Sequence, residues 1–288
     1  RDFLRRQGRA SWSPVLLIYP LLKKLVGDKV TAKLGGNIRY AISGGAALPF
    51  GVARTFIGLG LEILQGYGLT ETSPIISVNR PGNNDPASVG EALRGIQARI
   101  AENDELVVKS PGIMLGYWNN HAATAEMIDP DGWLHTGDQA RIEGGRIYIT
   151  GRIKDILVLS NGEKVPPVDM EAAICLDPLF DQALVVGEGR PSLAAVVVLN
   201  PDLWFGFARE LGLDPFARES LENEQLQRKV LSRLQKQLHE FPGYAKIRHV
   251  ILTLEPWTVD DDLVTPTLKV KRARVMERFA EQIEALYD

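Results

Sequence analysis

The sequence predicts an α/β and α+β fold in which three regions follow one another along the chain. A βαβ pattern over residues 38–64 predicts a parallel sheet. Short alternating apolar runs between residues 88 and 149 predict a small β-rich subdomain, and a mixed helix and strand pattern begins after Gly151. We therefore expect domains over residues 1–87 (part of an α/β subdomain), 88–152 (β-rich) and 153–288 (α+β).

The βαβ unit has a strand predicted at residues 38–42, a turn of small residues at 43–47, a helix at 49–59 and a second strand at 61–64. Ligands of parallel sheets bind beyond the carboxyl ends of the strands. We therefore expect a binding site at the turn that follows the first strand and at a loop around Gly66.

The later elements are predicted from periodicity. In the β-rich region we expect strands at residues 98–100, 105–109 and 146–149. Beyond it we expect a hairpin around Asn161 and Gly162, a helix at 168–176, and strands at 182–186 and 193–199. The strongest helical pattern covers residues 220–241, where one face is apolar: Leu221, Leu226, Val230, Leu231, Leu234, Leu238 and Phe241.

Composition narrows the class of protein. The chain has 288 residues, 45% of them hydrophobic, and a formal net charge of −3. This balance allows a packed core and argues against nucleic-acid binding along the whole sequence. The one cysteine, Cys175, excludes an internal disulfide framework, favours the reducing cytoplasm and is expected to pack on a helix.

The N-terminal segment combines arginines with an apolar run at residues 15–22. The run contains Pro20 and is too short to span a bilayer, so neither a signal peptide nor a membrane span is predicted. Two interpretations stay open: a helix packed on its own domain, or peripheral contact with a membrane surface. Because position 1 is not Met, we expect the sequence to be part of a longer polypeptide.

Four segments combine glycine with polar residues that suit a nucleotide: SGGAAL at 43–48, GYGLTE at 66–71, HTGD at 135–138 and GRIKD at 151–155. Glycine lets backbone amides approach a phosphate, a tyrosine ring can stack on a base, and an acid can bind ribose hydroxyls or Mg²⁺. Each segment alone is also typical of ordinary turns. A fifth segment, TPTLKVKR at 265–272, completes an ordered set.

In order and spacing, the five segments resemble the adenylate-forming superfamily of acyl-CoA synthetases, luciferases and peptide-synthetase adenylation domains. Residues 34–36, 43–48 and 263–269 resemble its long-chain fatty acyl-CoA synthetase branch in particular. The resemblance implies ATP-dependent ligation of a long-chain fatty acid to CoA through an acyl adenylate, with Mg²⁺ as cofactor. It also implies that the first region is the C-terminal part of a nucleotide-binding subdomain and that the C-terminal domain is mobile.

The resemblance assigns the nucleoside to five residues. Tyr67 is expected to stack on adenine, with the backbone of Gly45 and Ala46 along the edge of the base. Asp138 and Arg152 are expected to hold the ribose hydroxyls. These five residues form the cofactor-binding set that the resemblance implies for ATP.

Five further residues receive roles in the chemistry. Thr70 is expected to bind the α-phosphate and Glu71 to hold Mg²⁺. Lys269 matches the lysine that bridges the substrate carboxylate and the α-phosphate, where a reaction between two anions needs a cation. Gly162 is expected to line the pantetheine tunnel for CoA, and Lys154 to be the hinge between the domains.

The sequence departs from the superfamily pattern at three places. No phosphate loop is found in residues 1–42, so the chain is expected to be a C-terminal portion that is poorly active alone. Asp169 replaces a glutamate, and Leu268 replaces a glycine, as is common in the long-chain branch. Two alternatives stay open: another acid–CoA ligase or adenylating enzyme, and a non-catalytic module that binds AMP or a partner protein.

Overall fold

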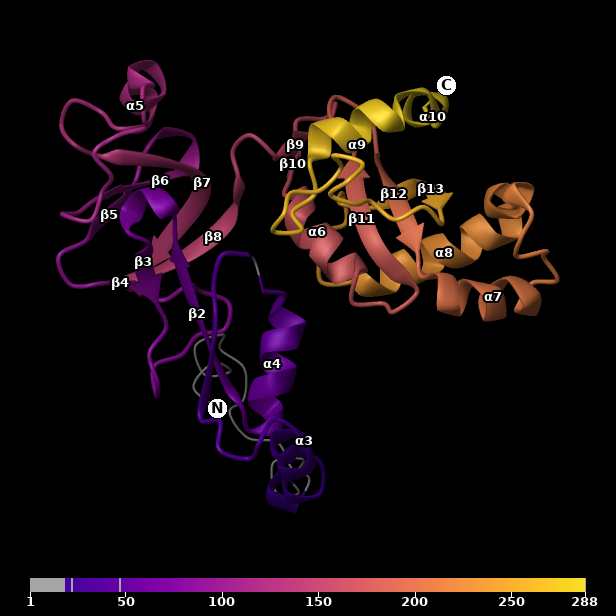
Figure 1. Ribbon diagram of the computed structural model, residues 1–288, viewed down its shortest axis with the longest axis horizontal. Helices are drawn as coiled ribbons and strands as arrows, with labels where there is room; N and C mark the ends of the chain where they lie inside the picture. The colour runs from indigo at the N-terminus through magenta and orange to yellow at the C-terminus, as the bar shows by residue number, and fades with distance from the viewer. Residues whose placement is uncertain (1–18, 22, 47, 288) are drawn as a thin grey trace. The chain divides into compact units, whose positions relative to one another are not determined.

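The computed structural model describes residues 19–21, 23–46 and 48–287, which belong to two compact units, Arg1–Ile153 and Lys154–Asp288 (Figure 1). The N-terminal segment, for which a packed helix and peripheral membrane contact both stay open, lies almost entirely outside the described residues. Within them, no helix has the length and apolar character needed to cross a membrane.

The first unit is built on one mixed sheet. Its short N-terminal helical elements are η1 (Lys23–Gly27) and α3 (Asp28–Lys33). Strands β1 (Tyr40–Ser43) and β2 (Glu62–Gly68) pair in parallel and are connected by α4 (Phe50–Leu59). The predicted βαβ unit is confirmed.

The expectation of a loop at Gly66 is wrong. Strand β2 continues to Gly68 because β3 (Ile75–Val78) pairs antiparallel with its last three residues. Glycine at position 66 suits this pairing, since a side chain there would approach the Ser77 carbonyl oxygen at 3.3 Å. Residues 66–68 at this end of β2, Tyr67 among them, are therefore held in the sheet by β3, whereas the pairing with β1 ends at Gln65.

The remaining strands of the first unit are antiparallel, and the sheet order is β1-β2-β3-β4-β8-β7-β6-β5. The strands are β4 (Glu91–Ala92), β5 (Gln97–Ile100), β6 (Glu105–Lys109), β7 (Leu134–Glu143) and β8 (Arg146–Arg152). Short helical segments lie between them: η2 (Thr70–Thr72), η3 (Glu102–Asp104) and α5 (His121–Met127). The predicted β-rich region is confirmed, and the boundary expected at residue 88 stays a prediction.

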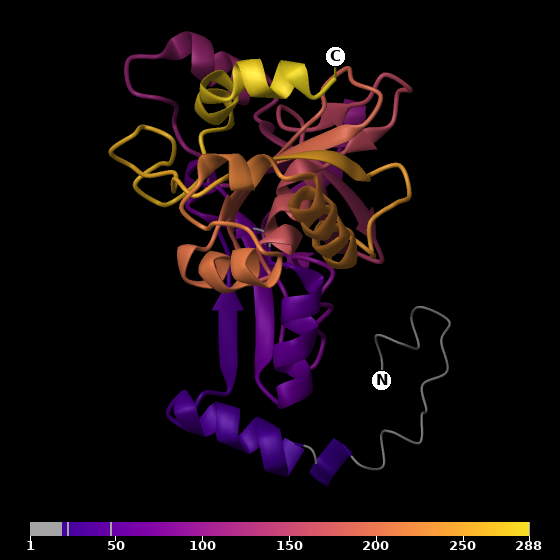
Figure 2. The same cartoon turned by 90° about the vertical axis from the view of Figure 1, so that its right-hand side faces the viewer.

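The second unit is a three-stranded sheet covered by helices on both faces (Figures 1 and 2). Strands β11 (Phe180–Val186), β12 (Leu193–Leu199) and β13 (Ile247–Thr253) lie in that order. One face carries α6 (Pro167–Ile174), α7 (Pro201–Glu210) and α8 (Glu224–Gln237), and the other carries α9 (Arg272–Arg278) and α10 (Ala280–Ala285).

Residues of β11 alternate between two cores, as the period of a strand requires. Ala183 and Val185 pack toward α6 and α8, whereas Leu184 and Val186 pack toward α9 and α10. The predicted hairpin at Gly162 is confirmed as the antiparallel pair β9 (Leu157–Val158) and β10 (Lys164–Val165).

Two expectations about the second unit are corrected. The helix predicted over 220–241 is divided into η4 (Arg218–Glu222) and α8, because the Asn223 side chain caps α8 by accepting from the backbone N–H groups of Gln225 and Leu226. Its apolar face is buried as predicted, with Leu226 fully inaccessible. Cys175 does not pack in the core; it ends α6 and is exposed.

Candidate functional site

Three residues predicted from separate segments of the sequence meet in the first unit. Tyr67 comes from β2, Asp138 from β7 and Arg152 from the end of β8. The Tyr67 hydroxyl donates to Oδ2 of Asp138 at 2.5 Å, and Nε of Arg152 lies 3.2 Å from Oδ1. The Asp138 side chain is 11% exposed and that of Arg152 is 53% exposed, so the carboxylate is buried below a solvent-facing cation.

The backbone around Asp138 is fixed by two polar side chains. Oγ1 of Thr136 accepts from the Asp138 N–H at 3.1 Å and donates to the Leu106 carbonyl at 2.7 Å. Glu105 accepts from the Gly137 N–H at 2.9 Å. Gly137 has a φ of 70°, which favours glycine, and a register shift follows it in β7. Together these contacts hold the backbone of Asp138 where its carboxylate accepts the hydrogen bond of the Tyr67 hydroxyl.

Burial determines the protonation state of the Tyr67 phenol. Desolvation raises the pKa of Tyr67 far above its ordinary value, and the charge of Asp138 raises it further. The phenol therefore remains a donor and Asp138 remains its acceptor. Because the hydroxyl of Tyr67 is hydrogen-bonded to Asp138, the ring of Tyr67 is held in one orientation.

The turn after β1 lies next to the same end of β2. Ser43 pairs with Gln65 across the parallel strands, so Gly45 and Tyr67 each lie two residues beyond that pair. Gly45 has a φ of 82°, and Ala46 is exposed. The structure thus brings the predicted adenine-edge residues and the predicted stacking residue to the same end of the βαβ unit.

Thr70 and Glu71 form the short turn η2 directly after β2. Thr70 is exposed, and the Glu71 carboxylate accepts a hydrogen bond of 2.8 Å from the Tyr117 hydroxyl. The Glu71 carbonyl accepts from the Met114 N–H at 2.8 Å. The loop that contains Met114 and Tyr117 therefore supports this turn, a relationship that the motifs did not reveal.

Glu71 suits a magnesium ion that is shared with phosphates. Mg²⁺ is commonly held by one or two carboxylates plus substrate oxygens. Glu71 is partly exposed and only one of its oxygens is engaged by Tyr117. In the described part of the chain, no group of three or more His, Cys, Asp and Glu side chains could hold a metal without such a substrate.

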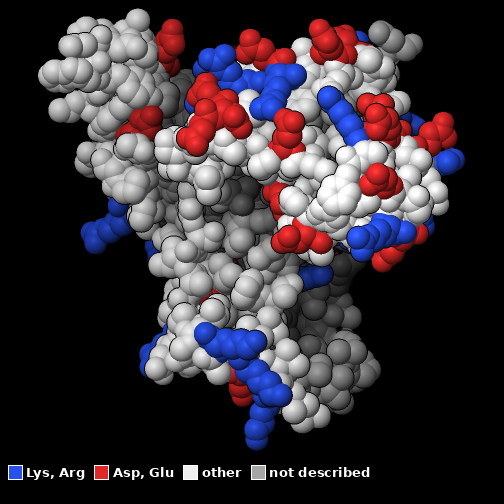
Figure 3. Space-filling model, turned by 45° about the vertical axis from the view of Figure 1, so that its right-hand side comes forward, with Lys and Arg blue, Asp and Glu red and all other residues white. Residues whose placement is uncertain are grey.

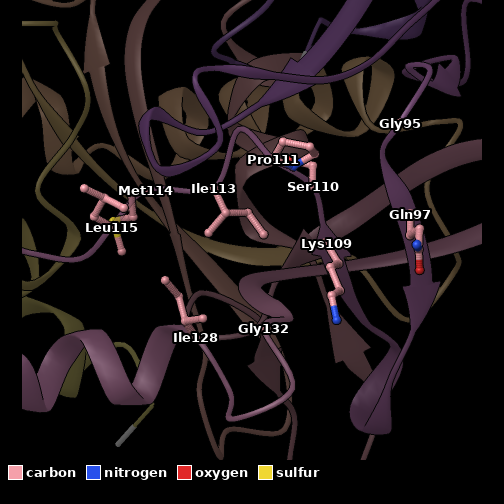
Figure 4. A pocket seen from close by; sticks show the side chains of 10 residues that line it. All are labelled: Gly95, Gln97, Lys109, Ser110, Pro111, Ile113, Met114, Leu115, Ile128 and Gly132. Carbon is pink, nitrogen blue, oxygen red and sulfur yellow. The ribbon is translucent and has the colours of Figure 1, made fainter.

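The loop that supports Glu71 also lines an open cavity of about 640 Å³ (Figure 4). Its walls are largely apolar and include Ile113, Met114 and Ile128, while Lys109 contributes a cation that donates to the Asp131 carbonyl at 2.6 Å. None of the predicted site residues lines this cavity. It is therefore a neighbour of the Glu71 turn and not a part of the Tyr67 cluster.

The other predicted residues lie in the second unit, and the structure places them within that unit only. Lys154 is its first residue, and Gly162, with a φ of 85°, closes the β9–β10 hairpin. Lys269 is exposed on a hairpin whose strands meet at Val264 and Val270. Figure 3 shows cationic and anionic side chains interspersed over the upper part of the face in view.

Two family descriptions match most of the chain. Residues 13–118 match the AMP-binding enzyme family, and residues 154–288 match the AMP-binding enzyme C-terminal domain. Among curated relatives, "Probable acyl-activating enzyme 16, chloroplastic" of Arabidopsis thaliana is 33% identical over 94% of this chain and 40% of its own length. Long-chain-fatty-acid–CoA ligase FadD15 of Mycobacterium tuberculosis is 34% identical over 94% of this chain and 45% of its own length. The chain therefore spans less than half of these relatives.

Solved structures of adenylation domains are similar to this chain as well. The adenylation domain of a carboxylic acid reductase from Segniliparus rugosus, in complex with AMP and a co-purified carboxylic acid, is 26% identical with a TM-score of 0.74, and the match covers 99% of this chain and 44% of that one. The adenylation domain of a carboxylate reductase from Mycobacterium chelonae is 25% identical with a TM-score of 0.77 over the same shares. The chain thus belongs to the AMP-binding enzymes of the adenylate-forming superfamily.

Proposed function

We propose that the protein carrying this chain joins a long-chain fatty acid to CoA through an acyl adenylate, using ATP and Mg²⁺. The observation that supports this most directly is the cluster of Tyr67, Asp138 and Arg152, which three distant segments build at one place. The similarity to a long-chain-fatty-acid–CoA ligase over nearly all of this chain supports the substrate class.

In this proposal, the first unit holds the nucleoside. Tyr67 stacks on adenine beside the backbone of Gly45 and Ala46, and Asp138 accepts from the ribose hydroxyls with Arg152 beside it. The Tyr67 hydroxyl and Arg152 fix the Asp138 carboxylate before the nucleotide arrives. A fixed acceptor has no reorganisation to undergo during binding, which favours affinity.

The first half-reaction joins two anions. A carboxylate oxygen of the acid forms a bond to the α-phosphorus while pyrophosphate leaves. Thr70 donates to the α-phosphate and Lys269 brings positive charge to both reacting groups, so repulsion between them falls as the bond forms. Glu71 would hold Mg²⁺, which supplies further positive charge to the phosphates.

The second half-reaction forms the thioester. The CoA sulfur attacks the acyl carbon, AMP leaves, and the thiol proton passes to solvent. Gly162, on the β9–β10 hairpin, lines the path of pantetheine. A carboxylate must first reach the α-phosphate of ATP, and a large thiol must then reach the acyl carbon of the adenylate. The second unit therefore rotates about Lys154, where the two units divide.

The proposal is tested on the protein encoded by the complete reading frame that contains these residues. We expect ATP–pyrophosphate exchange that depends on palmitate, and conversion of palmitate to its CoA thioester. Faster exchange with aryl or medium-chain acids would assign another acid–CoA ligase. AMP binding without exchange by any acid would instead assign a non-catalytic nucleotide-binding module.

A further inference from the structure

A nearly buried ion pair joins two helices of the second unit. Glu171 lies in α6 and Arg272 is the first residue of α9, and their side chains are 14% and 17% exposed. The guanidinium of Arg272 binds the Glu171 carboxylate directly through Nη1. The two residues are 101 positions apart in the sequence, so the pair is a tertiary connection.

Both charged groups also bind the backbone of one residue, Val185. Its N–H donates to Oε1 of Glu171 at 2.7 Å, and its carbonyl accepts from Nη2 of Arg272 at 2.6 Å. Val185 lies in β11, an outer strand of the three-stranded sheet. The ion pair thus satisfies backbone groups at the sheet edge and attaches both helices to it.

Lys269 lies on the hairpin that the pairing of Val264 with Val270 closes, which we call the lysine hairpin. Arg272 follows Lys269 by three residues, where the chain leaves this hairpin. Within that hairpin, the Lys269 N–H donates to Oγ1 of Thr265 at 3.0 Å and its carbonyl accepts from the Thr265 N–H at 2.8 Å. At its base, the Lys271 N–H donates to the Leu263 carbonyl at 2.8 Å, and Leu263 is 4% exposed. The hairpin is internally ordered, so its orientation depends on how its base is anchored.

We propose that the Glu171–Arg272 pair is a positioning device for Lys269. It fixes the exit of the lysine hairpin to the edge of β11 and so determines where the ammonium group is presented. Glu171 belongs to the helix that directly follows the β9–β10 hairpin of Gly162. The same pair therefore connects the two loops to which the two half-reactions are assigned. This inference rests on the proposed function, because it concerns the role of Lys269 in adenylation.

The first test separates positioning from stability. Arg272→Met should lower kcat for palmitate-dependent pyrophosphate exchange on the order of 10- to 100-fold, because small misplacements of a catalytic group are costly. The KM for ATP should change little, since Arg272 does not touch the nucleotide in this proposal. Arg272→Met leaves Glu171 without its partner and can lower stability, so the double variant Glu171→Leu/Arg272→Met is needed. Replacing both charges with apolar groups leaves no unpaired charge and should raise the melting temperature above that of Arg272→Met. It should stay below that of the parent, because the Val185 N–H and carbonyl lose their partners.

A matched control is present in the same unit. Arg233 of α8 binds Asp177 through two hydrogen bonds of 2.8 and 2.6 Å, and the Asp177 side chain is 7% exposed. Asp177→Leu/Arg233→Met removes an ion pair of the same kind that has no connection to the lysine hairpin. It should leave kcat close to that of the parent. Arg272→Lys should retain more activity than Arg272→Met, because it keeps the charge but not both donors.

A second readout does not depend on activity. Hydrogen exchange of the peptide spanning residues 263–271 should lose protection in the Glu171→Leu/Arg272→Met variant and keep it in the Asp177→Leu/Arg233→Met variant. Low kcat together with lost protection, measured well below the melting temperatures of both double variants, would support the inference. Unchanged protection, or a kcat that recovers with the melting temperature, would overturn it. If the parent protein catalyses no exchange with any acid, the proposed function fails, while hydrogen exchange still decides whether the pair holds the hairpin.

Discussion

The hydroxyl of Tyr67 donates a hydrogen bond of 2.5 Å to Oδ2 of Asp138, which Arg152 contacts from the other side at 3.2 Å. The connection joins β2 to β7, two strands that are not neighbours in the sheet. Asp138 is only 8% exposed, so its charge depends on these donors in place of water. The geometry of the proposed ribose site therefore depends on contacts made before any ligand binds.

Asp138→Asn should weaken AMP binding. The amide keeps the shape of the carboxylate but removes the charge that Arg152 contacts and weakens the acceptor for the Tyr67 hydroxyl. Hydrogen bonds to charged groups contribute about 1.5–3 kcal/mol, which corresponds to a loss of affinity of roughly 10- to 150-fold. Isothermal titration calorimetry with AMP measures the change.

The control for this variant is Asp85→Asn. The Asp85 carboxylate accepts from the Tyr148 hydroxyl at 3.0 Å in the same unit, but neither residue belongs to the proposed site. This substitution should lower the melting temperature and leave AMP affinity unchanged. Equal losses of affinity in both variants would show that Asp138 acts only through stability.

Tyr67→Phe should change how stability depends on alkaline pH. The folded-state pKa of Tyr67 is raised by burial and by Asp138, so above about pH 10 the unfolded chain releases this proton while the folded chain retains it. Stability is thus lost as pH rises, by at most about 1.4 kcal/mol per pH unit for one group. Phenylalanine has no such proton, so the variant should lose less stability. Urea unfolding between about pH 8 and pH 11 tests this, and parallel curves would contradict the assigned cause.

Local patterns predicted the elements whose signals are short-range. The strand Glu105–Lys109 was predicted with its observed ends, because apolar residues and flanking turns define it within one segment. The extension of β2 through Gly66 was missed because pairing with β3 overrides the tendency of glycine to form loops. The break before α8 could have been predicted, since Asn223 is a common N-cap residue.

The same contrast between local signals and long-range contacts holds for the candidate site. The resemblance named Tyr67, Asp138 and Arg152, and the structure brings them together. It did not identify Tyr117, which binds Glu71 from 46 residues away, because no periodicity relates such positions. Contacts of this kind depend on how the loops cross in space, which a single sequence does not encode in any local pattern.

Tyr117→Phe should impair the proposed magnesium step without unfolding the protein. The substitution keeps the ring but removes the hydroxyl that donates to Glu71, and Tyr117 is partly exposed, at 36%. Glu71→Gln should show a larger effect in the same direction, because it removes the charge that attracts Mg²⁺. Magnesium titrations of pyrophosphate exchange should give a higher half-saturating concentration for both variants. A lowered melting temperature with normal magnesium dependence would assign both residues to the support of the turn.

Lys269→Ala should damage adenylation far more than thioester formation. The lysine is exposed on its hairpin, so its removal leaves no cavity, and the loss concerns charge at the reacting phosphate. Losing one such cation commonly lowers the rate by about 10²-fold or more. Pyrophosphate exchange measures the first half-reaction, and conversion of supplied acyl adenylate to thioester measures the second. Equal losses in both would assign Lys269 a structural role.

Lys154→Pro tests whether the two half-reactions use different arrangements of the two units. Lys154 is the first residue of the second unit, and the preceding Ile153 is held to the first unit by its N–H, which donates to the Gly137 carbonyl at 2.9 Å. A rotation between the units therefore has to be absorbed at the residues that directly follow. Proline fixes φ near about −65° and removes the amide donor, so it restricts the change in backbone angles that a rotation requires. We expect adenylation to survive largely and thioester formation to fall sharply.

Stopped-flow measurement of both half-reactions decides between the outcomes. Lys154→Ala is the control, because it removes the side chain but keeps the backbone free. Equal losses in both half-reactions would indicate a folding defect, and no loss in either would place the hinge elsewhere.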